Sequence, residues 1–294
     1  MTDSTSAPDA ADQSVLVAVD GSQPSTHAVA WAAAEAVLHH RNLHIVTSYG
    51  YHPLSGLDAV LATREGELLR SAAEHTLARA ERAARRTRPE VRVSTQLTFE
   101  LIVPMLIDRS TRAAMIVVGS RRYGPVRRTL FGSVSTEVSR RAHCPVAIVS
   151  EGVPTDPAAA NRPVLAGVDD LDTGAATLDI AFDEAARRKV GVVVLKSGQD
   201  SNPPEFPGAT VRRHRPGGDD DPTAEWRARY PHVPVEALVV VEDSVSALLD
   251  RARQAQLLVI GSHGLTGFAG LHDAAATAEL SRQVDCPVIV AHGR

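Results

Sequence analysis

The sequence predicts an α/β protein made of two tandem, doubly wound domains. In each domain we expect a five-stranded parallel sheet in the order 3-2-1-4-5, flanked by helices. Two observations support this fold class. The chain repeats itself, and each copy alternates short apolar, β-branched runs with alanine-rich or amphipathic runs.

Three segments of the first half recur, in the same order, in the second half. They are VLVAVDGS at 15–22 with VLAGVDDL at 164–171, MIVVGSRRYG at 115–124 with LLVIGSHGLT at 257–266, and RRAHCPVAIV at 140–149 with RQVDCPVIVA at 282–291. The first match has an offset of 149 residues and the other two have an offset of 142, so the second copy is seven residues shorter in its middle (149 − 142). Three ordered matches indicate two homologous domains in tandem.

The repeat also predicts where the domains begin and end. We expect a disordered N-terminal tail over 1–13, because these residues are polar and acidic. The first domain then covers 14–151 and the second 163–294. Between them, residues 152–162 are rich in Pro, Ala and Asn and are interpreted as a linker.

The first copy gives a clear order of elements. Apolar runs predict five strands, and alanine-rich or charged amphipathic runs between them predict four helices. Pro24 stands where proline is tolerated at the start of a helix. In chain order the elements are a strand at 15–20, a helix at 25–41, a strand at 43–49, a helix at 65–87, a strand at 90–99, a helix at 102–111, a strand at 115–120, a helix at 133–142 and a strand at 145–150.

The second copy departs from this order in its middle. After a strand at 190–196, residues 197–222 are dense in Pro, Gly and charged side chains and predict a loop. A short helix is expected near TAEWRARY at 223–230, in place of the long second helix of the first copy.

Composition excludes several classes of protein. The 294 residues carry a net charge of −4, so there is no overall attraction to nucleic acid or to an anionic membrane, and neither is an expected partner. No apolar run reaches the roughly 20 residues that span a bilayer, and the N-terminus lacks the pattern of a signal peptide. We therefore expect a cytoplasmic protein. Its two cysteines, Cys144 and Cys286, are interpreted as packing residues, and His39 and His40 are expected to end a helix.

Polar residues follow the strands whose ends should meet. In an open parallel sheet, ligands bind beyond the carboxyl ends of the strands where the strand order reverses. Asp20, Gly21 and Ser22 follow the first strand, Ser48 ends the second, and Gly119 and Ser120 end the fourth. Asp20 would accept hydrogen bonds from a ribose or an adenine amino group. Alternatively, Asp20–Ser22 is only the N-terminal turn of a helix, which this tripeptide also suits.

Taken together, the segments VAVDGS, VVGSRR…LFGSVS and CPVAIV resemble the universal stress protein family, in the tandem two-domain form common in actinobacteria. The resemblance covers essentially the whole chain. Many members bind ATP through a Gly, two residues, a Gly, nine residues, and then Gly-Ser or Gly-Thr. The resemblance therefore implies ATP as the ligand, with or without Mg²⁺, held by the backbone around these glycines.

Each domain keeps a different part of this motif. The first domain supplies Gly119 and then, at the implied spacing, Gly132 and Ser133, followed by Val134 and Ser135; the second glycine of the motif falls on Arg122. The second domain supplies Asp169, Gly261 with Ser262, and Gly264, but its closing pair falls on Ala274 and Ala275. The first domain is thus the better candidate for nucleotide binding, and the second is interpreted as largely vestigial.

The arginines at this loop have two interpretations. Arg121 and Arg122 could make charge-assisted hydrogen bonds to a phosphate. They could equally face solvent on an exposed loop. If the motif requires a left-handed backbone at this position, Arg122 costs about 1–2 kcal/mol there.

The resemblance implies a stress-response protein. We expect it to be non-enzymatic, because no catalytic acid–base pair or nucleophile stands out. An adenine nucleotide, bound mainly in the first domain, would alter dimerisation or the choice of an unidentified protein partner. The alternative is a nucleotide-free scaffold that acts through protein contacts; an ATP-cleaving enzyme is the weakest hypothesis. In this family the last strands of two domains pair edge to edge. Residues 145–150 and 287–292 could do so within one chain, and a homodimer of chains is also expected.

Overall fold

The first repeat folds as the expected α/β layer. The computed structural model describes residues 13–50, 59–120, 133–151, 157–169, 171–197, 210–213, 223–241, 244–262, 280–281 and 283–293. In the first repeat it contains β1 (Val15–Ala18), α1 (Gln23–Leu38), β2 (Leu43–Ser48), α2 (Ala59–Thr87), β3 (Val93–Thr98), α3 (Ile102–Arg109), β4 (Met115–Ser120), α4 (Ser133–Arg141) and β5 (Val146–Ser150). Its strands are all parallel and lie in the order β3-β2-β1-β4-β5, which confirms the predicted order.

The second repeat follows the same order. After the short α5 (Pro157–Ala160), it contains β6 (Val164–Val168), α6 (Leu171–Arg188), β7 (Val192–Ser197), β8 (Thr210–Arg213), α7 (Ala224–Arg229), β9 (Val235–Val241), α8 (Ser244–Ala252), β10 (Leu257–Gly261) and β11 (Val288–Ala291). The five parallel strands lie in the order β9-β7-β6-β10-β11.

One expectation for the second repeat is wrong. Within the segment 197–222, which the sequence predicts to be a loop, residues 210–213 form β8 and pair antiparallel with β9. The pairing supplies the hydrogen bonds that a short polar segment does not secure by itself. The residues on either side, 198–209 and 214–222, lie outside the described part of the chain.

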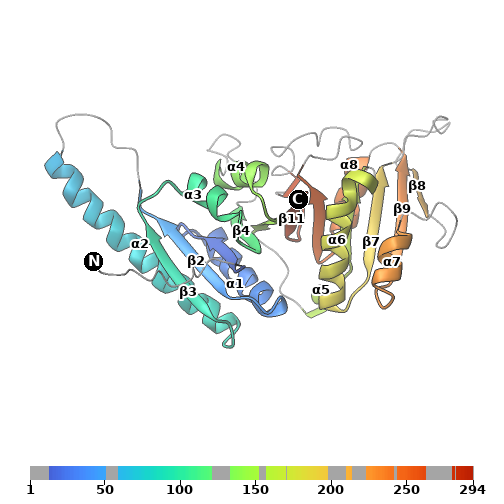
Figure 1. The fold of residues 1–294 in the computed structure, drawn as a ribbon, viewed down its shortest axis with the longest axis horizontal. Helices are drawn as coiled ribbons and strands as arrows, with labels where there is room; N and C mark the ends of the chain where they lie inside the picture. Colours follow the sequence, from blue (N-terminus) through green and yellow to red (C-terminus); the bar gives the residue numbers. More distant parts are fainter. Residues whose placement is uncertain are drawn as a thin grey trace, which may run out of the picture.

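The two repeats join through their last strands into a single sheet (Figure 1), to which the described residues contribute 11 strands. β5 and β11 pair antiparallel, with Val146 opposite Val290 and Ile148 opposite Val288. The expected edge-to-edge pairing within one chain is therefore present. It removes from solvent two strand edges that would otherwise be open to a second chain.

Side chains of each strand alternate between two cores. In β1, Val15 and Val17 face a core formed with α1 and α2, whereas Leu16 faces a second core under α3 and α4. This burial on both faces explains why the strands are continuous apolar runs instead of alternating ones. The first of these cores runs on into the second repeat beneath α6 and α7, while α8 covers the opposite face there.

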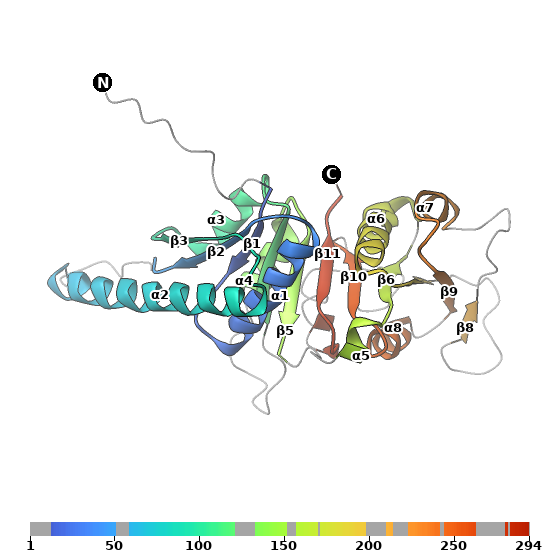
Figure 2. The same cartoon turned by 90° about the horizontal axis from the view of Figure 1, so that it is seen from below.

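The long helix α2 has a short counterpart in the second repeat. Figure 2 shows α2 running along the whole first repeat, whereas α7 has six residues. Aromatic rings fill the space that α7 covers: the ring centroid of Phe182 lies 6.4 Å from that of Trp226 and 5.8 Å from that of Tyr230. None of the described helices combines the length and apolar character needed to cross a lipid bilayer.

Candidate functional site

The candidate site lies where the strand order reverses in the first repeat. β1 pairs with β2 on one side and with β4 on the other, with Ala18 opposite Val46 and Val118. The segments that follow β1 and β4 therefore leave the same edge of the sheet. This is the place where open parallel sheets bind ligands.

The turn after β1 is held by its own side chains. The Oδ1 atom of Asp20 accepts hydrogen bonds from the Ser22 amide at 3.0 Å and from the Ser22 hydroxyl at 2.6 Å. Partial burial acts to raise the pKa of Asp20, but the hydrogen bonds from Ser22 outweigh it, and the pKa of this carboxyl is lowered. Asp20 is thus an exposed carboxylate at the carboxyl edge of the sheet.

The same turn starts α1. Ser22 is the N-cap, and its side chain accepts a hydrogen bond from the Ser25 amide. Pro24 has no amide proton, and the Thr26 amide donates to the Ser22 carbonyl at 3.2 Å. The first turn of α1 is therefore closed by its own cap, so the alternative of a helix N-terminal turn accounts for Ser22.

Helix α2 braces this turn, a contact that the sequence did not reveal. Gly21 has a φ of +81°, a left-handed conformation that favours glycine. The Arg79 Nη2 atom donates to the Gly21 carbonyl at 2.7 Å, and a Cβ atom on Gly21 would come within 3.0 Å of the Thr76 hydroxyl. An arginine on the face of an amphipathic helix gives no sequence signal for such a contact, because it depends on how the helix crosses the sheet.

Gly119 brings the end of β4 against the start of α1. A Cβ atom there would lie 2.7 Å from the Pro24 carbonyl carbon and 2.8 Å from the Ser25 amide nitrogen. The absence of a side chain at Gly119 is therefore required by helix–strand packing, whether or not a ligand is bound. Ser120, the next residue, is buried and ends the strand.

The residues predicted to end the nucleotide-binding motif lie at the start of α4. It begins at Ser133, with Val134 and the buried Ser135 in its first turn. The first amides of a helix have no partner within that helix, and the helix dipole favours an anion beside them. Arg121, Arg122 and Gly132 lie outside the described residues.

Ser48 has a structural role at the end of β2. Its hydroxyl donates to the Glu100 carbonyl at 2.6 Å and accepts from the Gly50 amide at 3.0 Å. These bonds tie the segment after β2 to the segment after β3. Ser48 therefore lies on the predicted edge of the sheet, with its hydroxyl engaged by the backbone.

The second repeat places the equivalent residues in the same way. Asp169 follows β6, Gly261 ends β10 and Ser262 comes next, and β6 and β10 are neighbours. At Gly261, however, a Cβ atom would lie 3.5 Å from the nearest atom, the Thr177 hydroxyl, which is ordinary contact. Gly264, Ala274 and Ala275 lie outside the described residues.

Chemically, the edge of the first repeat offers a hydrogen-bond acceptor, Asp20, and the N-terminus of a helix, α4. The lowered pKa of Asp20 keeps it ionised at neutral pH, as an acceptor for hydroxyl or amino groups. The N-terminus of α4 provides amide donors for a negatively charged group. This combination suits a ligand with a polar, donor-bearing part and a phosphate.

Comparison with known proteins agrees with this organisation. A model of the universal stress protein family matches residues 13–150 and again 160–292. A universal stress protein of Mycobacterium tuberculosis H37Rv is 32% identical over 287 residues, which covers 94% of this chain and 96% of that protein. A second universal stress protein of the same strain is 32% identical over 301 residues and covers 94% of each chain.

Solved structures give the same fold. The crystal structure of a universal stress protein from Archaeoglobus fulgidus matches 96% of this chain and 98% of its own, with a TM-score of 0.69 at 18% identity. At that identity the likeness concerns the fold alone. It extends over both repeats, so the tandem arrangement is shared and not only the single domain.

Proposed function

The chain belongs to the universal stress protein family, and from that premise we propose that its first repeat binds ATP or a related adenine nucleotide, with or without Mg²⁺. The proposal is carried by one observation. The Asp20 turn and the end of β4 leave neighbouring strands at the switch point of the sheet. The family resemblance supports it further, because many members bind ATP through a motif that Gly119, Gly132 and Ser133 match here.

Each end of the site has a distinct role in this proposal. Asp20 accepts hydrogen bonds from the nucleoside, and the first turn of α4, from Ser133 to Ser135, holds phosphate through its amides. The capped N-terminus of α1 is not used in this proposal, since Ser22 already accepts from the Ser25 and Thr26 amides and Pro24 has no amide proton. Among the loop residues, Gly132 and the charged Arg121 and Arg122 would approach the phosphates.

The second repeat is proposed to contribute little binding. Its Asp169 and Gly261–Ser262 keep the strand-end positions, but alanines replace the residues that correspond to Gly132 and Ser133. We therefore expect about one nucleotide per chain. The bound nucleotide would act non-enzymatically, by changing how the chain contacts a second copy or another protein.

A homodimer would have to use a surface other than the paired last strands. β5 and β11 already pair with each other inside the chain.

We further propose that the protein acts in the cytoplasm, where ATP is abundant and thiols stay reduced; Cys144 and Cys286 are both free and buried.

Thermal unfolding in the presence of nucleotide tests the proposal. A ligand that binds only the native state at 100 times its Kd stabilises it by about 2.7 kcal/mol. The melting temperature should rise with ATP, with and without Mg²⁺, and rise less with GTP. No rise with any adenine nucleotide at millimolar concentration would reject nucleotide binding. Mass analysis of nucleotide released from protein purified without added ligand is the companion measurement.

A nucleotide-free scaffold is the second candidate, and the Asp20 turn favours it. Its carboxylate already bonds Ser22, so the turn is complete without a ligand. The discriminating change is Arg122→Gly, which restores the second glycine of the motif. If Arg122→Gly and Gly132→Ala each leave both nucleotide binding and partner capture unchanged, this loop is not the functional site.

A further inference from the structure

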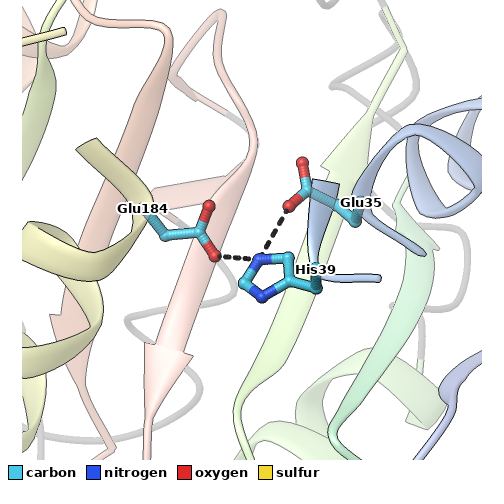
Figure 3. Close-up of side chains that lie close together, drawn as sticks. All are labelled: Glu35, His39 and Glu184. Atoms are coloured by element: carbon cyan, nitrogen blue, oxygen red, sulfur yellow. Dashed lines mark hydrogen bonds and ion pairs between the residues drawn. The ribbon is translucent and has the colours of Figure 1, made fainter. Parts of the chain in front are cut away.

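A group of four ionisable side chains, two buried and two partly buried, lies between the two repeats at the last turns of α1 and α6. Glu35 and His39 come from α1, and Glu184 and Arg188 come from α6. Figure 3 shows Glu35, His39 and Glu184 pointing toward one another across this junction. The side chains of Glu35 and Glu184 are only 1% and 2% exposed. Burial of two carboxylates is costly unless cations match them.

The four residues occupy equivalent positions in the two repeats of the sequence. Glu184 follows Glu35 by 149 residues, and Arg188 follows His39 by the same 149 residues, the offset of the VLVAVDGS match. Each helix thus presents a glutamate and, four residues later, a cationic side chain on the same face. The pairs are equivalent by position but differ in chemistry, because one cation is a histidine and the other an arginine.

The cations cross the junction to pair with the opposite glutamate. Arg188 Nη2 donates to Glu35 Oε1 at 2.5 Å, and it also lies 2.9 Å from Glu184 Oε2. His39 Nε2 lies 2.8 Å from Glu184 Oε1 and 3.5 Å from Glu35 Oε2. Each carboxylate therefore contacts Arg188 with one oxygen and His39 with the other.

The balance of charges indicates whether this group binds a proton or a metal ion. Two carboxylates carry two negative charges, and Arg188 supplies one positive charge that it keeps at all ordinary pH values. A proton on His39 supplies the second and makes the group neutral. Although Glu35, His39 and Glu184 have metal-ligand spacing, a divalent cation would displace that proton and leave an excess positive charge beside Arg188. The arrangement favours a proton over a metal ion.

We propose that these four side chains form a proton-dependent latch between the two repeats. The ion pairs of Arg188 are present at all ordinary pH values, whereas those of His39 are present only while His39 is protonated. The latch holds α1 against α6. It does not depend on nucleotide binding.

The electrostatics agree with this geometry. Burial alone would lower the pKa of His39, but hydrogen bonds and charge attraction from Glu184 and Glu35 raise it to about 9. In the described part of the chain, the charged groups that face His39 are Glu35 on its own helix and Glu184 and Arg188 on α6. Because the folded value lies above the ordinary value of 6.5, the stabilisation is fully present below about pH 6.5 and is lost as the pH rises through about 9.

Denaturant unfolding between pH 7 and pH 10 tests the latch. The variant His39→Gln stays neutral at every pH, whereas Arg188→Gln removes the equivalent cation of the second repeat. The ratio of unfolding constants between His39→Gln and the parent protein should fall roughly 70-fold over this range. For Arg188→Gln the ratio should not fall, because His39 keeps its proton-linked contact and loss of the neighbouring positive charge only raises the pKa of His39. His75→Gln, at an exposed position on α2, is the control. Its ratio of unfolding constants to the parent protein should stay constant over this pH range.

A direct titration keeps the proposal testable if a variant does not fold. The His39 ring resonance of the parent protein should titrate near pH 9, and Glu184→Gln should lower that midpoint. A midpoint below pH 7, or a constant ratio for His39→Gln, overturns the latch. Micromolar zinc that raises the melting temperature of the parent protein but not of His39→Gln also overturns it, and would identify a metal site instead.

Discussion

Arg188 is the side chain whose removal should expose the balance of charges between the repeats. In Arg188→Met the two glutamates, 1% and 2% exposed, keep only His39 as a cation. Loss of one partner from a buried ion pair costs about 3–5 kcal/mol, because an uncompensated charge stays buried. The methionine fills a similar volume, so most of the cost is electrostatic and not a cavity.

This cost can be converted into a melting temperature. If the 294 residues unfold together, the entropy of unfolding is about 0.6 kcal/mol per kelvin. A loss of about 4 kcal/mol then lowers the melting temperature by about 6–7 °C. Calorimetry gives both the temperature and the enthalpy, and urea unfolding at pH 7 gives the free energy independently.

A second change should recover part of this loss. In Glu35→Leu with Arg188→Met, the remaining Glu184 and His39 form a matched pair at 2.8 Å, and apolar side chains fill the other positions. Replacing a buried ion pair with apolar residues is often neutral. The double variant should therefore be more stable than Arg188→Met alone. If it is less stable, or if Arg188→Met costs under about 1 kcal/mol, the charge-balance reasoning is wrong.

Three further predictions concern backbone geometry and the thiols. Gly119→Ala should lower the free energy of unfolding in urea by about 1–3 kcal/mol, because the new Cβ atom would lie 2.7 Å from the α1 backbone. Gly261→Ala, at the equivalent position, should change this free energy little, because the nearest atom to its Cβ would be 3.5 Å away. Equal effects would contradict the close approach seen only in the first repeat. Gly21→Ala should cost about 1–2 kcal/mol from its φ of +81°; a neutral result in the same assay would count against the left-handed turn. Burial raises the pKa of Cys144 and of Cys286 to about 12 each, so a thiol reagent at pH 7–8 should react with both only after unfolding, and rapid reaction of the native protein would refute their burial.

The order of strands could be predicted because each strand and helix has a local sequence pattern, and the patterns occur in both repeats. Each strand is a short apolar run, each connection is long enough for a helix, and parallel strands with right-handed crossovers leave few topologies. The pairing of β5 with β11 was expected from the family resemblance, and the structure confirms it. The strand at 210–213 was missed, because its four residues depend on pairing with β9 and have no apolar pattern of their own.

Contacts between elements were harder to predict than the elements themselves. Asp20, Ser22 and Gly119 lie on the predicted edge, but the brace from Arg79 depends on how α2 crosses the sheet. His39 does end α1, as expected, since it is the C-cap residue. Its pairing with Glu184 was not foreseen, although the shared offset of 149 residues was present in the sequence. The relevance of that offset becomes visible only once the two repeats are placed side by side.

Calorimetric titration with ATP tests the central claim most directly, on the parent protein and on the matched variants Asp20→Ala and Asp169→Ala. Circular dichroism should first show that both variants are folded. We predict about one nucleotide per chain, binding that is strongly weakened in Asp20→Ala, and binding that is retained in Asp169→Ala. Absence of binding to the parent protein, or loss of binding only in Asp169→Ala, would contradict a nucleotide site in the first repeat.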